Sequence, residues 1–356
     1  MAAFQTKQKF IFTVKPCAGF RVEHIGKVYP SRPHTGYKGS AILIRTEIAV
    51  FHAVLDFDAC INDGNTADQY RQPPCDAVYS NQINRFRRKI MVGENNKVVI
   101  VTGGSSGIGR YTASALKENG CIVYEFSRRN IPMEGVTHLS VDVTDEDAVH
   151  AAVQQVVQKE TKIDAVINCA GFGISGAVEF TSMEQAKAQF DVNFFGTVTV
   201  NKAVLPFLRR QGKGHIVNIS SVAAVAHIPF QTFYSASKAA VSSYSYALAN
   251  EVKPYGIHVT VVELGDICTG FTKARQKSIL GDDEYGGRIS RSVSQMEHDE
   301  QNGMDPARIG RYIAGIVEKK KPAVVYVAGA QYKFLSLLCK LLPAAARGKI
   351  VGKIYG

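Results

Sequence analysis

The chain has 356 residues, 46% hydrophobic and 21% charged, as expected for one or two globular domains. The net charge is +11, but residues 1–90 hold +6 of it (13 Lys and Arg against 7 Asp and Glu), so the rest is only mildly basic and gives no reason to expect a nucleic-acid partner. No apolar run could span a membrane, the N-terminus lacks a secretory layout, and the seven cysteines lack metal-type spacing; we therefore expect a cytoplasmic protein with reduced thiols and no metal site.

The first ninety residues show no steady hydrophobic periodicity and are interrupted by prolines and glycines. Met91 then precedes a short polar stretch and an apolar run, which is the layout of a natural domain start. We expect residues 1–90 to be an irregular N-terminal extension, poorly ordered and dispensable.

A glycine-rich turn follows the apolar run Val98-Val99-Ile100-Val101-Thr102 and leads directly into a helical pattern. Glycines at 103, 107 and 109 let the backbone approach a pyrophosphate closely, and the helix start offers free N–H groups to its charge. This strand, loop and helix predict a dinucleotide site.

Strand and helix patterns alternate from Lys97 onward. Strands are expected at 98–102, 121–126, 137–141, 164–169, 214–220, 257–263 and 323–328, and helices at 107–119, 145–160, 183–211, 232–253 and 305–319. The alternation predicts an α/β fold: a doubly wound seven-stranded parallel sheet (Rossmann fold) in a single catalytic domain, residues 91–330.

The second strand ends in Ser127-Arg128-Arg129, where an NAD-specific site would place an acid on the ribose. A guanidinium suits a 2′-phosphate, so we expect NADP(H) to be favoured over NAD(H). Glu125 lies too early and is expected to point elsewhere. Asp142, after the third strand, is placed to accept from the adenine amino group.

Tyr234 and Lys238 stand four residues apart on an expected helix and therefore share a face. A nearby ammonium favours the phenolate, so Lys238 is expected to lower the pKa of Tyr234. Ser221, at the end of the fifth strand, could hydrogen-bond a substrate carbonyl.

Taken with Asn168-Cys169-Ala170-Gly171 and Asn193, these motifs resemble the short-chain dehydrogenase/reductase family over residues 97–330. The resemblance implies that Tyr234 is the general acid/base, that Lys238 also holds the nicotinamide ribose, that Ser221 polarises the reacting oxygen, and that Asn193 anchors a proton-relay water. It also implies that Gly265, Ile267 and Thr269 hold the carboxamide. The expected cofactor-binding residues are Gly103, Ser105, Ser106, Gly107, Ile108, Gly109, Ser127, Arg128, Arg129, Asp142, Val143, Asn168, Ala170, Gly171, Tyr234, Lys238, Gly265, Ile267 and Thr269.

Two positions depart from the family pattern. Cys169 replaces the usual second Asn, with little expected effect because the position is structural. Leu264 replaces the usual Pro, which is expected to loosen the turn that carries Thr269.

The segments 172–178 and 222–233 are mostly apolar and should border the reacting carbon, which favours a lipophilic ketone or alcohol. The segment before Tyr234 is similar to that of 17β-hydroxysteroid and retinol dehydrogenases, so a hydroxysteroid is the expected substrate. Two alternatives stay open: a 3-oxoacyl (acyl-carrier-protein) reductase docking through Arg209, Arg210 and Lys213, and a dinucleotide-sensing protein without turnover.

Residues 270–304 are polar and are expected to form a mobile lid. Residues 331–356 form an expected amphipathic helical tail with basic flanks. The tail could rest on a membrane, cap the substrate cleft or pack on a second subunit; we expect packing, with peripheral membrane contact as the second interpretation. A homo-oligomer is also expected.

Overall fold

The computed structural model describes residues 96–355. The expected N-terminal extension, residues 1–90, and the domain start at Met91 lie outside the described residues. The described part is an α/β fold around a seven-stranded parallel sheet in the order β3-β2-β1-β4-β6-β7-β9. The doubly wound sheet expected from the sequence is therefore confirmed.

The strands of this sheet lie within two residues of their predicted ranges. They are β1 (Val98–Thr102), β2 (Ile122–Ser127), β3 (Val136–Ser140), β4 (Ala165–Asn168), β6 (Gly214–Ser221), β7 (Ile257–Leu264) and β9 (Val325–Val327). A second, two-stranded sheet pairs β5 (Ile174–Ser175) with β8 (Gln276–Lys277) and was not expected.

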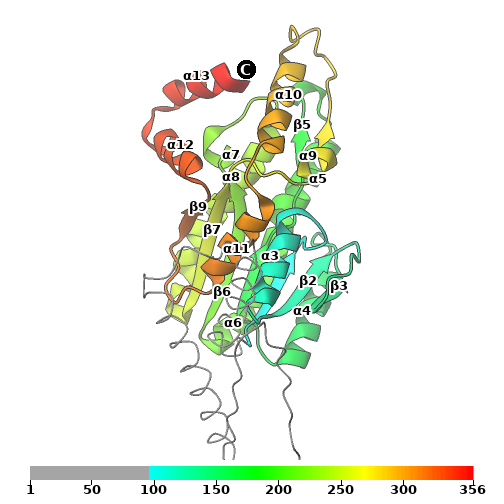
Figure 1. Cartoon of the computed structure of the whole chain (residues 1–356), viewed down its shortest axis with the longest axis vertical. Helices are drawn as coiled ribbons and strands as arrows, with labels where there is room; N and C mark the ends of the chain where they lie inside the picture. Colours follow the sequence, from blue (N-terminus) through cyan, green and yellow to red (C-terminus); the bar gives the residue numbers. More distant parts are fainter. Residues whose placement is uncertain (1–95, 356) are drawn as a thin grey trace, which may run out of the picture. The chain divides into compact units, whose positions relative to one another are not determined.

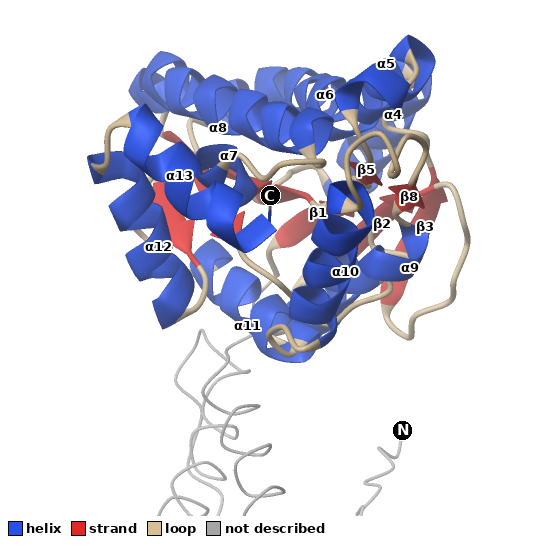
Figure 2. Cartoon of the chain, turned by 90° about the horizontal axis from the view of Figure 1, so that it is seen from above, coloured by secondary structure: helices blue, strands red, loops and turns tan. Residues whose placement is uncertain are grey.

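Helices cover both faces of the large sheet, as Figure 2 shows. One face packs against α4 (Glu146–Glu160), α6 (Gly196–Gln211) and α8 (Thr232–Val252), and the other against α3 (Gly107–Glu118) and α11 (Pro306–Val317). Strand β1 shows why: Val98 and Ile100 belong to the first core, Val99 and Val101 to the second, and all four are fully buried.

The remaining elements refine three expectations. The predicted helix 183–211 is α5 (Met183–Phe190) and α6, joined by the π-helix η2 (Asp191–Phe195). The expected lid contains α9 (Phe271–Ala274), β8 and α10 (Arg288–Gln301), and its movement stays a prediction. The expected tail is two helices, α12 (Ala330–Leu341) and α13 (Ala344–Tyr355). Short turns complete the chain: η1 (Val178–Phe180), α7 (Ala223–Ala226) and η3 (Lys253–Tyr255).

The strand order reverses between β1 and β4, and a crevice forms there at the carboxyl ends of parallel strands. Figure 1 shows α7, α10, α12 and α13 gathered at one end of the described chain. Helices α12 and α13 both pack on α7, and α13 also packs on α10. The tail therefore packs on the rest of the described chain, while its contacts with a second subunit or a membrane stay predictions.

Candidate active site

The glycine loop between β1 and α3 has the geometry of a phosphate cradle. Gly103 has φ +69° and lies so close to Ala170 that a Cβ would stand 2.8 Å from its Cα. Gly107, with φ +53°, has open space where a Cβ would be. Ser106 precedes α3 without capping it through its side chain, so the first N–H groups of the helix remain available to an anion. The loop therefore fits a pyrophosphate.

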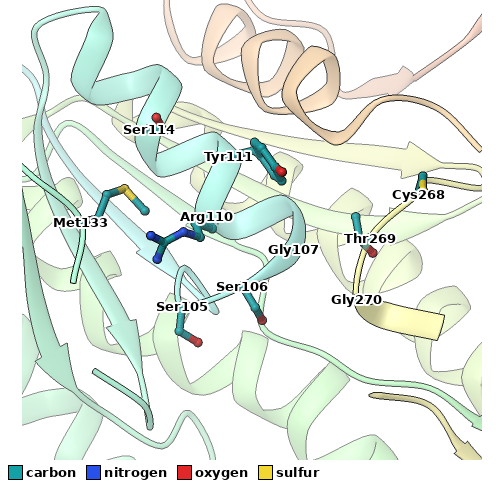
Figure 3. Close-up of a pocket in the computed structure, with 10 residues that line it drawn as sticks. All are labelled: Ser105, Ser106, Gly107, Arg110, Tyr111, Ser114, Met133, Cys268, Thr269 and Gly270. Atoms are coloured by element: carbon teal, nitrogen blue, oxygen red, sulfur yellow. The ribbon is translucent and has the colours of Figure 1, made fainter. Parts of the chain in front are cut away.

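A hollow of about 560 Å³ lies on the outer side of this loop, between the start of α3 and residues 268–270. Figure 3 shows Cys268 and Thr269 on one side of it, with Arg110 and Tyr111 of α3 on the other. Ser105, Ser106 and Gly107 also line the larger cleft described below, so the hollow is an extension of one groove.

Basic groups stand at the end of β2. The Arg128 side chain is 76% exposed, with Nη1 3.8 Å from Oδ2 of Asp142. Arg129 donates to the Ser106 hydroxyl over 3.3 Å. Glu125 is buried instead, 2.5 Å from Nδ1 of His138 and packed under Gly104. It therefore points away from the groove, as expected.

The carboxyl of Asp142 has a pKa below its usual range. Burial raises this pKa, but hydrogen bonds from the backbone and hydroxyl of Thr144 and the charge of Arg128 together outweigh it. An ionised acceptor thus stands beside the position expected for adenine.

Tyr234 and Lys238 lie on the first turns of α8, next to the end of β6. The Lys238 ammonium is 5.8 Å from the centre of the Tyr234 ring and donates to the Ile219 carbonyl over 3.0 Å. A hydrogen bond joins the Tyr234 side chain to that of Ser221. The hydroxyl of Ser221 also accepts from the Ala223 N–H at 3.1 Å, which fixes this hydroxyl at the carboxyl end of β6.

The electrostatics correct one expectation. Desolvation raises the pKa of Tyr234 to about 12, opposed by the hydrogen bond with Ser221. Lys238 is not among the groups that shift Tyr234; burial lowers the pKa of Lys238 itself to about 8. In the cofactor-free chain Tyr234 is therefore a protonated phenol, which suits a proton donor.

Asn193 owes its position to the π-helix. Its amide accepts from the Phe172 N–H at 3.0 Å and donates to the Phe172 carbonyl at 3.0 Å and to Ser237 at 3.1 Å. Single π-turns inside helices are frequent at functional sites. Asn193 is fully buried and does not line the cleft, but it fixes Phe172, which does.

Asn168 does not take the expected position. Its amide nitrogen donates to Asn201 and to Asn218, at 2.8 Å each, and the side chain is buried between β4, α6 and β6. Asn168 therefore holds the sheet to a helix instead of lining the cofactor groove.

The loop after β7 is ordered by the chain around it. Ile267 pairs with Met304, and the Thr269 hydroxyl accepts from the Phe271 N–H at 3.1 Å. Leu264 continues β7, paired with Ser221, so the strand runs to the loop without the usual Pro. The ring of Tyr332, from α12, lies against Gly265.

One cleft of about 920 Å³ joins these parts. Its lining includes every expected cofactor-binding residue except Asn168, together with catalytic candidates Ser221, Tyr234 and Lys238. Toward the substrate end it is bordered by apolar side chains, namely Phe172, Ala223, Ala226, Ile228, Phe271 and Leu335. His227, which precedes Ile228 in the same segment, is exposed and does not line the cleft.

Four polar residues at this end were missed in the sequence: Asp266, Glu300, Tyr332 and Tyr355. Tyr332 donates to Asp266 over 2.8 Å, and Glu300 binds Arg275 and accepts from Thr272. Burial and the carboxylates of Asp299 and Glu300 raise the pKa of Asp266, while the bond from Tyr332 lowers it. Only Asp266, within the recognised loop, had a signal in the sequence; the others come from distant helices.

Among residues 96–355, no three His, Cys, Asp or Glu side chains are grouped to hold a metal ion.

Known proteins match this chain in sequence and in structure. The short chain dehydrogenase family matches residues 97–279. A 3-ketodihydrosphingosine reductase from Bacteroides thetaiotaomicron is 44% identical over 229 residues, which cover 64% of this chain and 85% of that protein. The bovine dehydrogenase/reductase SDR family member 7B is 30% identical, over 65% of this chain and 73% of its own.

The crystal structure of a short-chain dehydrogenase from Streptomyces avermitilis superposes with a TM-score of 0.65 at 28% identity, covering 73% of this chain and 98% of that one. The chain therefore belongs to the short-chain dehydrogenase/reductase family, as an oxidoreductase that uses a nicotinamide dinucleotide on hydroxyl or keto groups.

Proposed function

We propose that this enzyme uses NADPH to reduce the ketone of a long-chain lipophilic substrate that carries an amino group, in the manner of 3-ketodihydrosphingosine. The observation that carries the proposal is Asp266, a carboxylate that lines the cleft beside both apolar and polar side chains and forms no ion pair with the described residues.

The charge balance around Asp266 supports a cationic substrate. Asp299 and Glu300 add two further carboxylates; Glu300 is paired with Arg275, and Nδ1 of His298 lies 3.5 Å from Asp299. A protonated amine would relieve this repulsion and stabilise the ionised form of Asp266. The aromatic ring of Tyr332, beside Asp266, offers the same group a cation–π contact.

The long chain of such a substrate needs an apolar wall. Ala223, Ala226 and Ile228, from the segment between β6 and α8, supply it with Phe172 and Leu335. A hydroxysteroid, expected from the sequence, would use the same wall but would leave Asp266 without a cation. A 3-oxoacyl substrate would likewise leave it unpaired, although Arg209 and Arg210 are exposed as a carrier-protein dock requires.

The preference for NADPH rests on Arg128. Its exposed guanidinium stands at the end of β2, where the adenosine ribose of a dinucleotide lies in this fold, and no acid replaces it, since Glu125 is directed into the core. Arg129, held by Ser106, adds a second positive charge beside the loop. Both suit a 2′-phosphate.

The roles of the side chains follow from their geometry. A bound reduced nicotinamide would supply the hydride for the carbonyl carbon. Tyr234, a phenol with a raised pKa, would donate its proton to the carbonyl oxygen, and Ser221 would hydrogen-bond that oxygen. Lys238 lies where it would hold the ribose, and Asn193 fixes the Phe172 backbone. That Asn193 anchors a proton-relay water is implied by the family resemblance and stays a prediction.

A comparison of two substrates tests the proposal. We expect Asp266→Asn to lower kcat/KM for 3-ketodihydrosphingosine about 10- to 150-fold, since a charged hydrogen bond of about 1.5–3 kcal/mol is lost, but to change little for the analogue without the amino group. Equal losses on both substrates, or faster turnover of a steroid ketone by the unaltered enzyme, would contradict it. NADPH and NADH are compared in the same assay.

We further propose, from the sequence, that the enzyme is cytoplasmic and homo-oligomeric and that residues 91–356 suffice for its activity.

A further inference from the structure

The outer surface of the two C-terminal helices is apolar. Phe334, Leu337 and Leu341 follow one another at helical spacing along α12, and Ile350 and Ile354 lie one turn apart on α13. Phe334 is 68% exposed and Leu341 73%, which is unusual for side chains of this size. We name these five residues the C-terminal apolar face.

The other side of the same helices is fixed to the enzyme. Ser336 and Lys340 of α12 both donate to Glu263, a fully buried carboxylate on β7, over 2.7 and 2.9 Å. Tyr332 lines the substrate end of the cleft, as does Tyr355 of α13. The anchored side keeps the apolar face turned outward and places it next to the substrate cleft.

The charge of these helices is of one sign. Residues 330–355 contain five basic residues and no acidic one. Lys340 pairs with Glu263, but Lys333, Lys349 and Lys353 are exposed and form no ion pair with the part of the chain that the structure describes. An apolar face with unpaired lysines around it complements a surface that is apolar inside and anionic outside.

We propose that the C-terminal apolar face docks on an anionic lipid surface. A second copy of the chain would bring the three exposed, unpaired lysines against three more, so self-association on this face is opposed by repulsion. Within residues 96–355 no helix is long and apolar enough to cross a membrane, so the helices lie on the lipid surface. This docking does not depend on the proposed reaction, because it would serve any substrate that dissolves in lipid.

Vesicle sedimentation of the full chain tests the docking. We compare phosphatidylcholine vesicles with vesicles that also contain phosphatidylglycerol. Two variants address the two halves of the proposal: Lys333→Glu/Lys349→Glu/Lys353→Glu removes the charge, and Phe334→Ser/Leu341→Ser removes apolar area. The matched control is Lys187→Glu/Lys213→Glu/Lys253→Glu, which reverses three exposed lysines elsewhere. Thermal melts and turnover of a water-soluble ketone establish that each variant is folded.

We expect binding to the anionic vesicles to fall at least about tenfold in each C-terminal variant and to persist in the control. Unchanged binding in either C-terminal variant would overturn the proposal and assign lipid contact to another part of the chain. Absence of binding in the unaltered protein would overturn it as well. A dimer that dissociates in Phe334→Ser/Leu341→Ser, without vesicle binding, would identify the face as a subunit interface.

Discussion

Lys238 is a catalytic candidate whose buried ammonium lowers the free energy of unfolding, and replacing this residue should show by how much. Burial lowers the pKa of this ammonium from 10.5 to about 8, a difference worth about 3 kcal/mol. Because the unfolded chain binds this proton more tightly, the full cost is present below pH 8 and disappears as the pH rises to 10.5. Lys238→Met keeps the volume, removes the charge and loses the bond to Ile219, worth about 1 kcal/mol.

At pH 7 the cofactor-free Lys238→Met variant should therefore be more stable by about 2 kcal/mol, which raises Tm by about 4–8 °C in a domain of this size, while turnover is lost. Thermal melts from pH 6.5 to 10.5 measure the difference, with Lys187→Met as an exposed control. The advantage should vanish near pH 10.5. A variant less stable at pH 7, or a gap that does not change with pH, would refute the reasoning.

Three further outcomes are expected. Tyr234→Phe should lower kcat about 10³-fold while the Kd of NADPH, measured by fluorescence titration, stays within about twofold. Arg128→Ala should raise KM for NADPH by about tenfold or more and leave KM for NADH nearly unchanged. A parallel rise of both KM values would show that Arg128 does not bind the 2′-phosphate. A chain that starts at Met91 should keep the Tm and the turnover of the full chain, and loss of either would show that residues 1–90 are required.

The sequence predicted the sheet well because its central strands are buried on both faces. A continuous apolar run such as Val98–Val101, which leads into a glycine turn, leaves little choice of element. The motif residues were predicted for a similar reason: Tyr234 and Lys238 are local on one helix, and Ser221 ends the strand before it.

Contacts between distant segments could not be predicted in this way. Asn168 belonged to a recognised motif, but its bonds to Asn201 and Asn218 depend on how α6 and β6 pack, which periodicity does not reveal. Glu300 and Tyr355 line the cleft, but they belong to helices in polar or basic parts of the sequence that gave no sign of a site. The expected effect of Lys238 on Tyr234 failed because spacing shows proximity and does not show desolvation.

The π-helix at Asp191–Phe195 also couples the site to the core. One extra residue in a helix rotates everything beyond it by about 100°, so η2 sets the direction in which α6 faces relative to α5. Deleting one residue there would restore regular hydrogen bonding but turn either Asn193 or the apolar side of α6 out of place. The position of the Asn193 amide and the packing of α6 on the sheet therefore depend on the same irregular turn.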